Sequence, residues 1–308
     1  MSAVVEAIAG IPALRRAGSL VTTQLKRWTV DAAISGFLKC GNTWYGAMLR
    51  QMMLERFAVT DVPLNRLMVS DLGPLPLAAF RLPRGMPRLY HGHFMPFPDS
   101  AELTGIRESL APFDDKPMIV LIRDAKDVLV SYYMMEIERF RRTHAARDIA
   151  DFVLGPVYGV KKFVGYYNVI AESRRGTKAP TLVTAYEDLW SDPVAIMERD
   201  AEFLGAGGLT RAAIQRIVRQ YSFDNMRQME LAATEETAIL PGLHRVAGSA
   251  PDAHFVRKGG SGNWREHLTP QIGMEIDRHV AAQLDPMFRR AAIHDPAAPT
   301  HTAVQAKA

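Results

Sequence analysis

Cysteine is almost missing from this chain of 308 residues, which contains Cys40 alone. One cysteine cannot form an internal disulfide, so the composition excludes a disulfide-stapled secreted fold and favours a reducing compartment. The sequence also lacks a long hydrophobic run, and its first thirty residues lack the basic start and cleavage site of a signal peptide. We therefore expect a soluble, cytoplasmic protein with no transmembrane segment.

A strong excess of one charge is missing as well, because the formal net charge is only +4. The basic residues are spread along the chain, which favours an anionic small ligand over nucleic acid as the partner. Hydrophobic residues make up 48% and charged residues 23% of the chain, as in a soluble globular protein. The length allows one large α/β domain or two ordinary domains.

The two ends of the chain differ in composition from the part between them. Residues 1–30 mix apolar and basic residues and predict an N-terminal helical segment that packs on the protein, with peripheral membrane contact as the alternative. Residues 31–294 form the main domain. Residues 295–308 are rich in alanine, proline and threonine and predict a disordered tail.

Three short apolar runs, each followed by a helical pattern, organise the main domain. The runs are 32–38, 118–122 and 181–185, and the helices that follow them span 43–57, begin after Asp124 as N-cap, and begin near Pro193. Alternating strands and helices predict a single α/β domain with a mostly parallel central sheet flanked by helices. Phosphate-bearing ligands then bind at the carboxyl ends of the strands.

The first strand leads into a P-loop-like turn, from Gly36 to Thr43. The glycine spacing fits a P-loop, but Asn42 stands where its lysine is expected and the basic residue is Lys39. Such a strand–loop–helix turn presents backbone N–H groups to an anion. A P-loop kinase or NTPase-like nucleotide-binding protein is therefore one alternative, although the sequence shows no clear acidic Mg²⁺ partner. A glycine-containing turn with a core tryptophan is the other.

This turn resembles the 5′-phosphosulfate loop of cytosolic sulfotransferases, Pro-Lys-Ser-Gly-Thr-Thr-Trp. Four of its seven positions match, and the departures are Leu38, Cys40 and Asn42. The resemblance implies 3′-phosphoadenosine-5′-phosphosulfate as co-substrate and no metal. It also implies that Lys39 contacts the leaving oxygen and that Trp44 stacks on adenine. The implied donor-binding residues of this loop are Lys39, Cys40, Gly41, Asn42, Thr43 and Trp44.

A second segment, Arg123 to Tyr133, resembles the 3′-phosphate element of the same family, Arg-Asn-Pro/Ala-Lys-Asp-Val-x-Val-Ser-x-Tyr. Arg123 follows a strand and Ser131 lies about two turns into the next helix, so both donors can reach one phosphate. The resemblance implies that Arg123 and Ser131 bind this phosphate and places Ser131 among the catalytic residues.

A third segment, Arg257 to Trp264, is similar to the family sequence Arg-Lys-Gly-x-x-Gly-x-Trp. Glycines allow the backbone to approach an anion closely, and the two cations supply charge. By resemblance, Arg257, Lys258 and Gly259 close over the 3′-phosphate.

Two further elements are similar to the family's adenine contacts. Tyr186 begins a Tyr-Glu-Asp sequence, and Ser222, Phe223 and Met226 match Ser-Phe-x-x-Met, whose phenylalanine stacks opposite the tryptophan. Phe223 and Met226 are equally compatible with an ordinary core. The whole resemblance extends from about residue 34 to 269.

His93 is the candidate general base, because the segment before Phe94 resembles the family's strand ending in Lys-Thr-His. His91 replaces the lysine, and alternation along a strand predicts that both imidazoles share one face. A metal site or a packed structural pair are the alternatives for His-Gly-His.

The predicted activity is transfer of a sulfuryl group to an acceptor hydroxyl or amine by in-line displacement. His93 is the base and Lys39 stabilises the leaving group. A non-catalytic nucleotide-binding module is disfavoured because both residues are present. Three variable segments, 64–82, 134–147 and 230–252, are expected to form the pocket for a small-molecule acceptor, whose identity stays open, as does the oligomeric state.

Overall fold

The computed structural model describes residues 30–64, 67–68, 82–95, 99–142, 146–240, 242–246, 254–293 and 304–305. The predicted N-terminal helical segment lies outside these residues, apart from Val30. In the described part of the chain no helix combines the length and the apolar character needed to cross a membrane.

Five strands form one sheet in the order β2-β1-β3-β4-β5. The strands are β1 (Ala32–Gly36), β2 (Leu89–Gly92), β3 (Met118–Ile122), β4 (Thr181–Ala185) and β5 (Val304–Gln305). The first four are parallel, which confirms the predicted single α/β domain with a mostly parallel sheet.

β5 pairs antiparallel with the open edge of β4 and belongs to the tail for which the sequence predicted disorder. An edge strand offers unpaired N–H and C=O groups to any nearby extended segment, which is what these two residues use. The other residues of the tail lie outside the described part of the chain.

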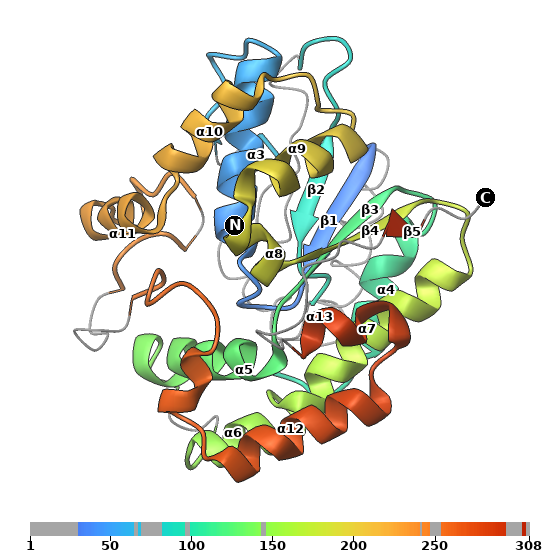
Figure 1. Cartoon of the computed structure of the whole chain (residues 1–308), viewed down its shortest axis with the longest axis vertical. Coiled ribbons are helices and arrows are strands. Elements are labelled where there is room, and N and C mark those ends of the chain that lie inside the picture. Colours follow the sequence, from blue (N-terminus) through green and yellow to red (C-terminus); the bar gives the residue numbers. More distant parts are fainter. Residues whose placement is uncertain are drawn as a thin grey trace, which may run out of the picture.

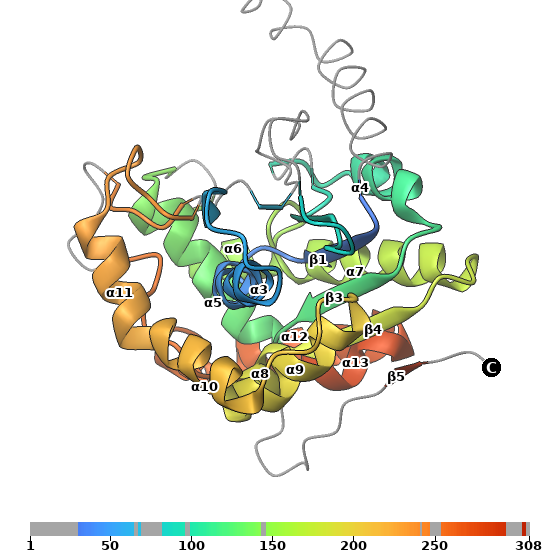
Figure 2. The same cartoon turned by 90° about the horizontal axis from the view of Figure 1, so that it is seen from above.

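Helices cover both faces of the sheet (Figure 1). The helices are α3 (Asn42–Arg56), α4 (Thr104–Leu110), α5 (Ala125–Tyr133), α6 (Ile149–Leu154), α7 (Val160–Arg175), α8 (Tyr186–Ser191), α9 (Pro193–Phe203), α10 (Arg211–Gln220), α11 (Phe223–Ala232), α12 (Pro270–Gln283) and α13 (Pro286–Ala292). A π-helical segment, η3 (Met134–Arg139), continues α5, and η2 (Ala111–Phe113) and η5 (Asn263–Glu266) are single 3₁₀ turns. Figure 2 shows α10 and α11 at the opposite end of the molecule from β5.

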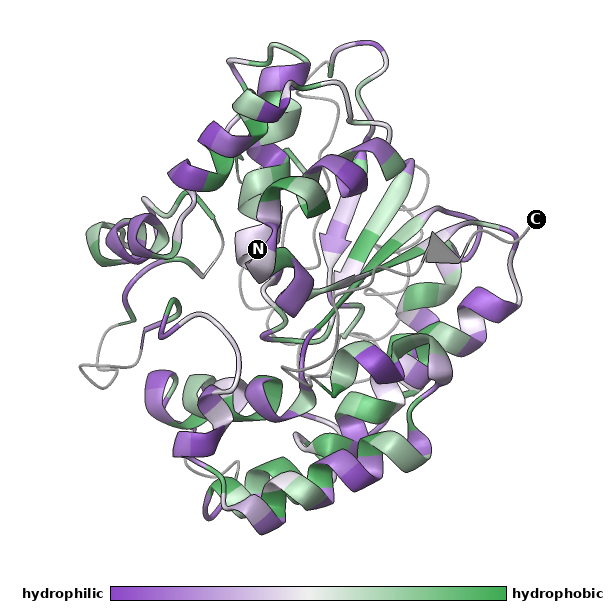
Figure 3. Cartoon of the chain, viewed as in Figure 1, coloured by the Kyte–Doolittle hydropathy of each residue, from purple (hydrophilic) through white to green (hydrophobic). Residues whose placement is uncertain are grey.

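Strand β3 shows how one sheet supports two cores. Met118, Val120 and Ile122 face a core formed with α5, α7 and α12, whereas Ile119 and Leu121 face a core formed with α3, α9 and α10. Since side chains alternate along a strand, a continuous apolar run buries both faces. The central strands accordingly stand out as hydrophobic, while the surrounding helices carry both hydrophobic and hydrophilic residues (Figure 3).

The helices begin where the sequence predicted. Asp124 caps α5 by accepting from the backbone N–H groups of Lys126 and Asp127, and Asp192 caps α9 just before Pro193. The cap at Asp124 starts α5 directly beyond the carboxyl end of β3. The carboxyl edge of the sheet is where the predicted binding residues meet.

Helix α3 packs closely on β2 at Gly46. The Arg50 guanidinium contacts His91 Nδ1 at 3.3 Å, and both side chains are buried. A Cβ atom at Gly46 would lie 2.4 Å from Arg50 Nη1 and 2.5 Å from His91 Cε1. Glycine is therefore needed at this point of the helix for packing, against its poor helix propensity.

Gly46→Ala should lower the free energy of unfolding by about 1–3 kcal/mol, the usual cost of overpacking a core. The matched control is Gly176→Ala, because Gly176 has φ −80° and a Cβ atom there would have Ser173 O, at 3.5 Å, as its nearest neighbour. This control should change stability by less than about 1 kcal/mol. Urea unfolding of both variants measures the difference, and equal effects would contradict the packing argument.

Candidate functional site

A cavity of about 190 Å³ opens at the carboxyl edge of the sheet, beside the ends of β1 and β3. Every predicted site residue lines it except Cys40 and Ser222. The predicted residues that line it are Lys39, Gly41, Asn42, Thr43, Trp44, His93, Arg123, Ser131, Tyr186, Phe223, Met226, Arg257, Lys258 and Gly259. Segments far apart in the sequence therefore meet at one place.

The loop between β1 and α3 has two residues in the left-handed region. Lys39 has φ 69° and Gly41 has φ 85°. Gly41 also permits a close approach, because a Cβ there would lie 2.6 Å from the Tyr186 ring. The Asn42 side-chain amide donates to Phe37 O at 2.9 Å and braces the loop from inside. The loop thereby turns the N-terminus of α3 toward the cavity, where its N–H groups favour an anion.

Cys40 and Ser222 were predicted to bind the donor, but neither residue lines the cavity. The Cys40 thiol lies in the core, 3.3 Å from the Tyr167 hydroxyl, and burial raises its pKa to about 12. Ser222 occupies the N-cap position of α11, next to Phe223, and its side chain makes no capping hydrogen bond.

Arg123 ties two of the loops together. Its guanidinium donates to Lys39 O at 3.3 Å and to Gly260 O at 2.8 Å. It also lies over the Tyr186 ring, 4.2 Å from the centroid. Arg123 thus fixes the P-loop-like turn against residues 257–264, the glycine-rich segment, while it also lines the cavity.

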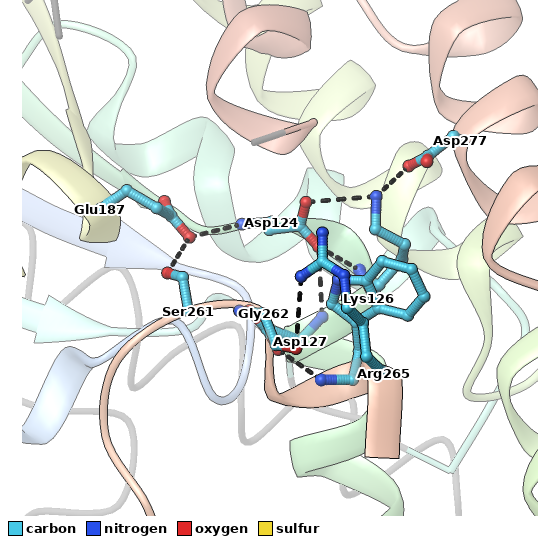
Figure 4. Close-up of polar contacts among 9 residues, drawn as sticks. Asp124, Lys126, Asp127, Glu187, Ser261, Gly262, Arg265 and Asp277 are labelled. Carbon is cyan, nitrogen blue, oxygen red and sulfur yellow. Dashed lines mark hydrogen bonds and ion pairs between the residues drawn. The ribbon is translucent and has the colours of Figure 1, made fainter. Parts of the chain in front are cut away.

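Two carboxylates, Asp127 and Glu187, accept hydrogen bonds from the glycine-rich segment (Figure 4). Asp127 accepts from the backbone N–H groups of Gly262 at 2.6 Å and Trp264 at 2.9 Å. Glu187 accepts from Asp124 N at 3.1 Å and from the Ser261 hydroxyl at 3.2 Å. Burial raises the pKa of Glu187 to about 7.

Lys126 completes this network and connects it to α12. Its ammonium lies between the carboxylates of Asp124 and Asp277 and 5.1 Å from the Trp264 ring centroid. Because Lys126 and Asp124 are both almost fully buried, neither charge is available to a ligand. Lys126 therefore stabilises the loops through its ion pairs, and it is not one of the cations that line the cavity.

The cavity itself is strongly cationic. Lys39, Arg123, Arg257 and Lys258 all line it. Burial, followed by repulsion from Arg139 and Arg123, lowers the pKa of Lys39 to about 7. Burial also lowers the pKa of Arg257. An anionic ligand would relieve this repulsion.

Aromatic rings form one wall of the cavity. The centroid of the Trp44 ring lies 6.1 Å from that of Tyr186 and 5.6 Å from that of Trp190. The Trp44 Nε1–H donates to Tyr221 O at 2.8 Å. Phe223 and Trp190 both lie close to Gly259, because a Cβ atom there would be 2.8 Å from Phe223 Cδ2 and 2.7 Å from Trp190 Cη2. Sequence reasoning missed Trp190, although its position four residues after Tyr186 on α8 places both on one helix face.

His93 lies just beyond β2, with Nδ1 2.7 Å from Gly36 O. A carbonyl oxygen only accepts, so Nδ1 carries the proton and a neutral imidazole has its lone pair on Nε2. His91, by contrast, does not line the cavity and is buried against Arg50. Burial and Arg50 hold the pKa of His91 well below its usual range. Among the described residues, no group of three or more potential ligands could hold a metal ion.

Comparison with known proteins gives consistent matches. The model of the sulfotransferase domain matches residues 30–288. Flavonol 3-sulfotransferase of Flaveria bidentis is 24% identical over 277 residues, covering 82% of this chain and 81% of that protein. Sulfotransferase 1A1 of Rattus norvegicus is 27% identical over 267 residues, covering 82% of this chain and 84% of the other.

Two solved structures share the fold. Mouse sulfotransferase SULT7A1 complexed with PAP aligns with a TM-score of 0.53 and 18% identity, covering 83% of this chain and 84% of that one. Retinol dehydratase in complex with androsterone and PAP aligns with a TM-score of 0.55 and 19% identity, covering 83% and 81%. At these identities the likeness establishes the fold.

Asp127→Asn should release the glycine-rich segment, because an amide offers one acceptor oxygen to two backbone donors. Hydrogen exchange at the Gly262 and Trp264 amides should accelerate at least about tenfold, since a hydrogen bond to a charged group contributes about 1.5–3 kcal/mol. The control is Asp151→Asn on α6, whose carboxylate contacts Arg147 and which should leave these amides unchanged. Unaltered exchange in Asp127→Asn would show that other contacts hold the segment.

Proposed function

The chain belongs to the sulfotransferase family and is a sulfotransferase, and from this premise we propose how it works and on what. It transfers the sulfuryl group of 3′-phosphoadenosine-5′-phosphosulfate to an acceptor hydroxyl or amine by in-line displacement. The observation that carries this proposal is the convergence of Lys39, Arg123, Arg257 and His93 on one cavity. The family match also sets aside the ATP-dependent alternative.

The residues of the cavity fit an adenosine bisphosphate. The N-terminus of α3, with Gly41 and Thr43, would hold the 5′-phosphate. Arg123, Ser131 and the segment Arg257–Gly259 would hold the 3′-phosphate. The adenine would lie at the aromatic wall that includes Trp44 and Phe223. Asp127 lines the cavity too, but both its oxygens already accept backbone N–H groups.

His93 acts as the general base in this proposal. The bond from Nδ1–H to Gly36 O fixes the ring and the tautomer, so that Nε2 can take the proton of the acceptor. As that proton arrives, the carbonyl of Gly36 continues to stabilise the imidazolium that forms. The bound donor supplies the activated sulfuryl group.

Lys39 stabilises the negative charge of the leaving phosphate. Because burial and the neighbouring arginines lower the pKa of Lys39 to about 7, an anion nearby would shift the amine toward the charged form. The interaction is strongest when the charge has developed, which is the condition for lowering the barrier.

The acceptor in this proposal is a small molecule with an apolar body. Leu38, Met135, Phe255 and Val256 line the cavity together with His93. This agrees with relatives named for flavonols and with the androsterone in one related structure. Several relatives are named cytosolic sulfotransferases, and we propose the same location here.

The desulfated product 3′-phosphoadenosine-5′-phosphate (PAP) should stabilise the protein more than AMP does, because its 3′-phosphate would contact Arg123 and Arg257. We expect PAP to bind at least about tenfold more tightly, since each charge-assisted contact contributes about 1.5–3 kcal/mol. Thermal unfolding with each nucleotide, and with ATP–Mg²⁺, measures this. Arg123→Ala should lose most of the preference, whereas the control Arg147→Ala, at a side chain 88% exposed, should keep it. Equal shifts by PAP and AMP in the unaltered protein would refute the assigned 3′-phosphate site.

His93→Ala should lower kcat by about 10²–10⁴-fold, the range for a general base, while PAP affinity is retained. His93→Asn is the sharper variant, because its amide nitrogen stands where Nδ1 stood and can still donate to Gly36 O but cannot take a proton. The control is His91→Ala, which should lose less activity per folded molecule, since His91 lies outside the cavity. Activity that survives in both His93 variants and collapses in His91→Ala would mean that the base is misassigned.

A further inference from the structure

A buried ion pair joins two segments that lie beside the cavity. The Arg139 guanidinium contacts the Glu230 carboxylate at 2.8 Å, and their side chains are 3% and 0% exposed. Arg139 ends η3, the π-helical continuation of the helix that carries Ser131, and Glu230 lies on α11. π-helical turns are often found at functional sites.

The pair also holds the chain that leads into the glycine-rich segment. The Glu230 carboxylate accepts from the backbone N–H groups of Phe255 at 2.6 Å and Val256 at 2.8 Å. One turn earlier on α11, Arg227 donates to Arg257 O at 2.9 Å. Helix α11 thus fixes three successive residues at the cavity wall.

Arg139 also anchors the segment 242–244. It donates to Gly242 O at 3.1 Å and to His244 O. A buried ion pair is weak evidence for a gain in stability, because apolar residues of similar volume often serve the core as well or better. The position that the pair imposes on its neighbours is the better explanation for its presence.

The residue held most directly is Phe255, and its ring faces Lys39. The Lys39 ammonium lies 4.2 Å from the centroid of this ring, within cation–π distance. The Arg139 guanidinium lies 5.6 Å from the same centroid. Phe255 and Lys39 both line the cavity, so the ring supports the ammonium inside the reaction site.

We propose that Arg139 and Glu230 are positioning residues for sulfuryl transfer, which hold the Phe255 ring as a platform for the Lys39 ammonium. This inference rests on the proposed role of Lys39. The platform keeps the ammonium at the cavity in a defined place, so that little reorganisation is needed when charge develops on the leaving group.

The charges around Lys39 make the inference testable without turnover. Besides burial, Arg139, Arg123 and Arg257 lower the pKa of Lys39, and Glu230 raises it. Leucine keeps an apolar group beside the amine but removes the cation–π interaction that the charged form makes, so the pKa should fall in Phe255→Leu. It must also fall in Glu230→Gln and rise in Arg139→Met. Opposite shifts in these two variants would show that both charges act directly on the Lys39 amine, and the Phe255 variants test the platform itself.

The experiment measures acetylation of Lys39 by acetic anhydride as a function of pH, with quantification by mass spectrometry. We expect the midpoint to move to lower pH in Phe255→Leu and Glu230→Gln and to higher pH in Arg139→Met. Phe255→Tyr should restore the midpoint of the unaltered protein, because it keeps the ring. The control is Glu172→Gln, which breaks an exposed ion pair on α7. Should either ion-pair variant fail to fold, the two Phe255 variants still decide, because Phe255 is only partly buried.

Kinetics then separates this inference from the proposed function. In Phe255→Leu we expect kcat to fall about three- to thirtyfold, the effect of one cation–π contact of up to about 2 kcal/mol, with the donor KM changed less than about threefold. An unchanged midpoint together with an unchanged kcat in Phe255→Leu would overturn the platform while leaving sulfuryl transfer intact. If the unaltered protein itself transfers no sulfuryl group, the proposed function fails, and the acetylation midpoints still report on the platform.

Discussion

The gathering of positive charge in one cavity is the constraint on which the rest of this structure depends. Lys39, Arg123 and Arg257 repel one another at close range, and burial makes the repulsion stronger. The fold therefore has to hold them by other contacts. Arg123 does so through two backbone carbonyls, which leaves the net charge of the cavity for an anion.

The acidic residues nearby explain how the cavity stays cationic. Asp127, Glu187 and Glu230 each accept hydrogen bonds from loop donors, so their oxygens act as anchors for the backbone around the cavity. A carboxylate oxygen that accepts a backbone N–H has fewer lone pairs left for a direct hydrogen bond to a cation that lines the cavity. The same residues thus order the glycine-rich segment and preserve its attraction for phosphate.

The sequence predicted the sheet, the helix starts at Asp124 and Pro193, and the segments that meet at the cavity, because these follow from apolar periodicity, caps and extended motifs. It could not predict that the Cys40 side chain lies in the core, since the residue types of a loop do not show where each side chain points. Nor could it predict the contact of Arg139 with Glu230, which are 91 positions apart. Strand alternation predicted that His91 and His93 share a face, but it could not show that His91 packs against Arg50 on α3, because that contact is tertiary.

Transfer of a sulfuryl group from the donor to an acceptor in this cavity can be tested by tracing the sulfur atom of that group. The protein is incubated with 3′-phosphoadenosine-5′-phosphosulfate carrying ³⁵S, together with a metabolite extract or single phenolic acceptors, and the products are separated by chromatography with mass spectrometry. We expect label in the acceptor, one PAP released for each label transferred, and little release when the acceptor is omitted. Label that stays in the donor with every acceptor, although PAP binds the protein tightly, would contradict sulfuryl transfer in this cavity.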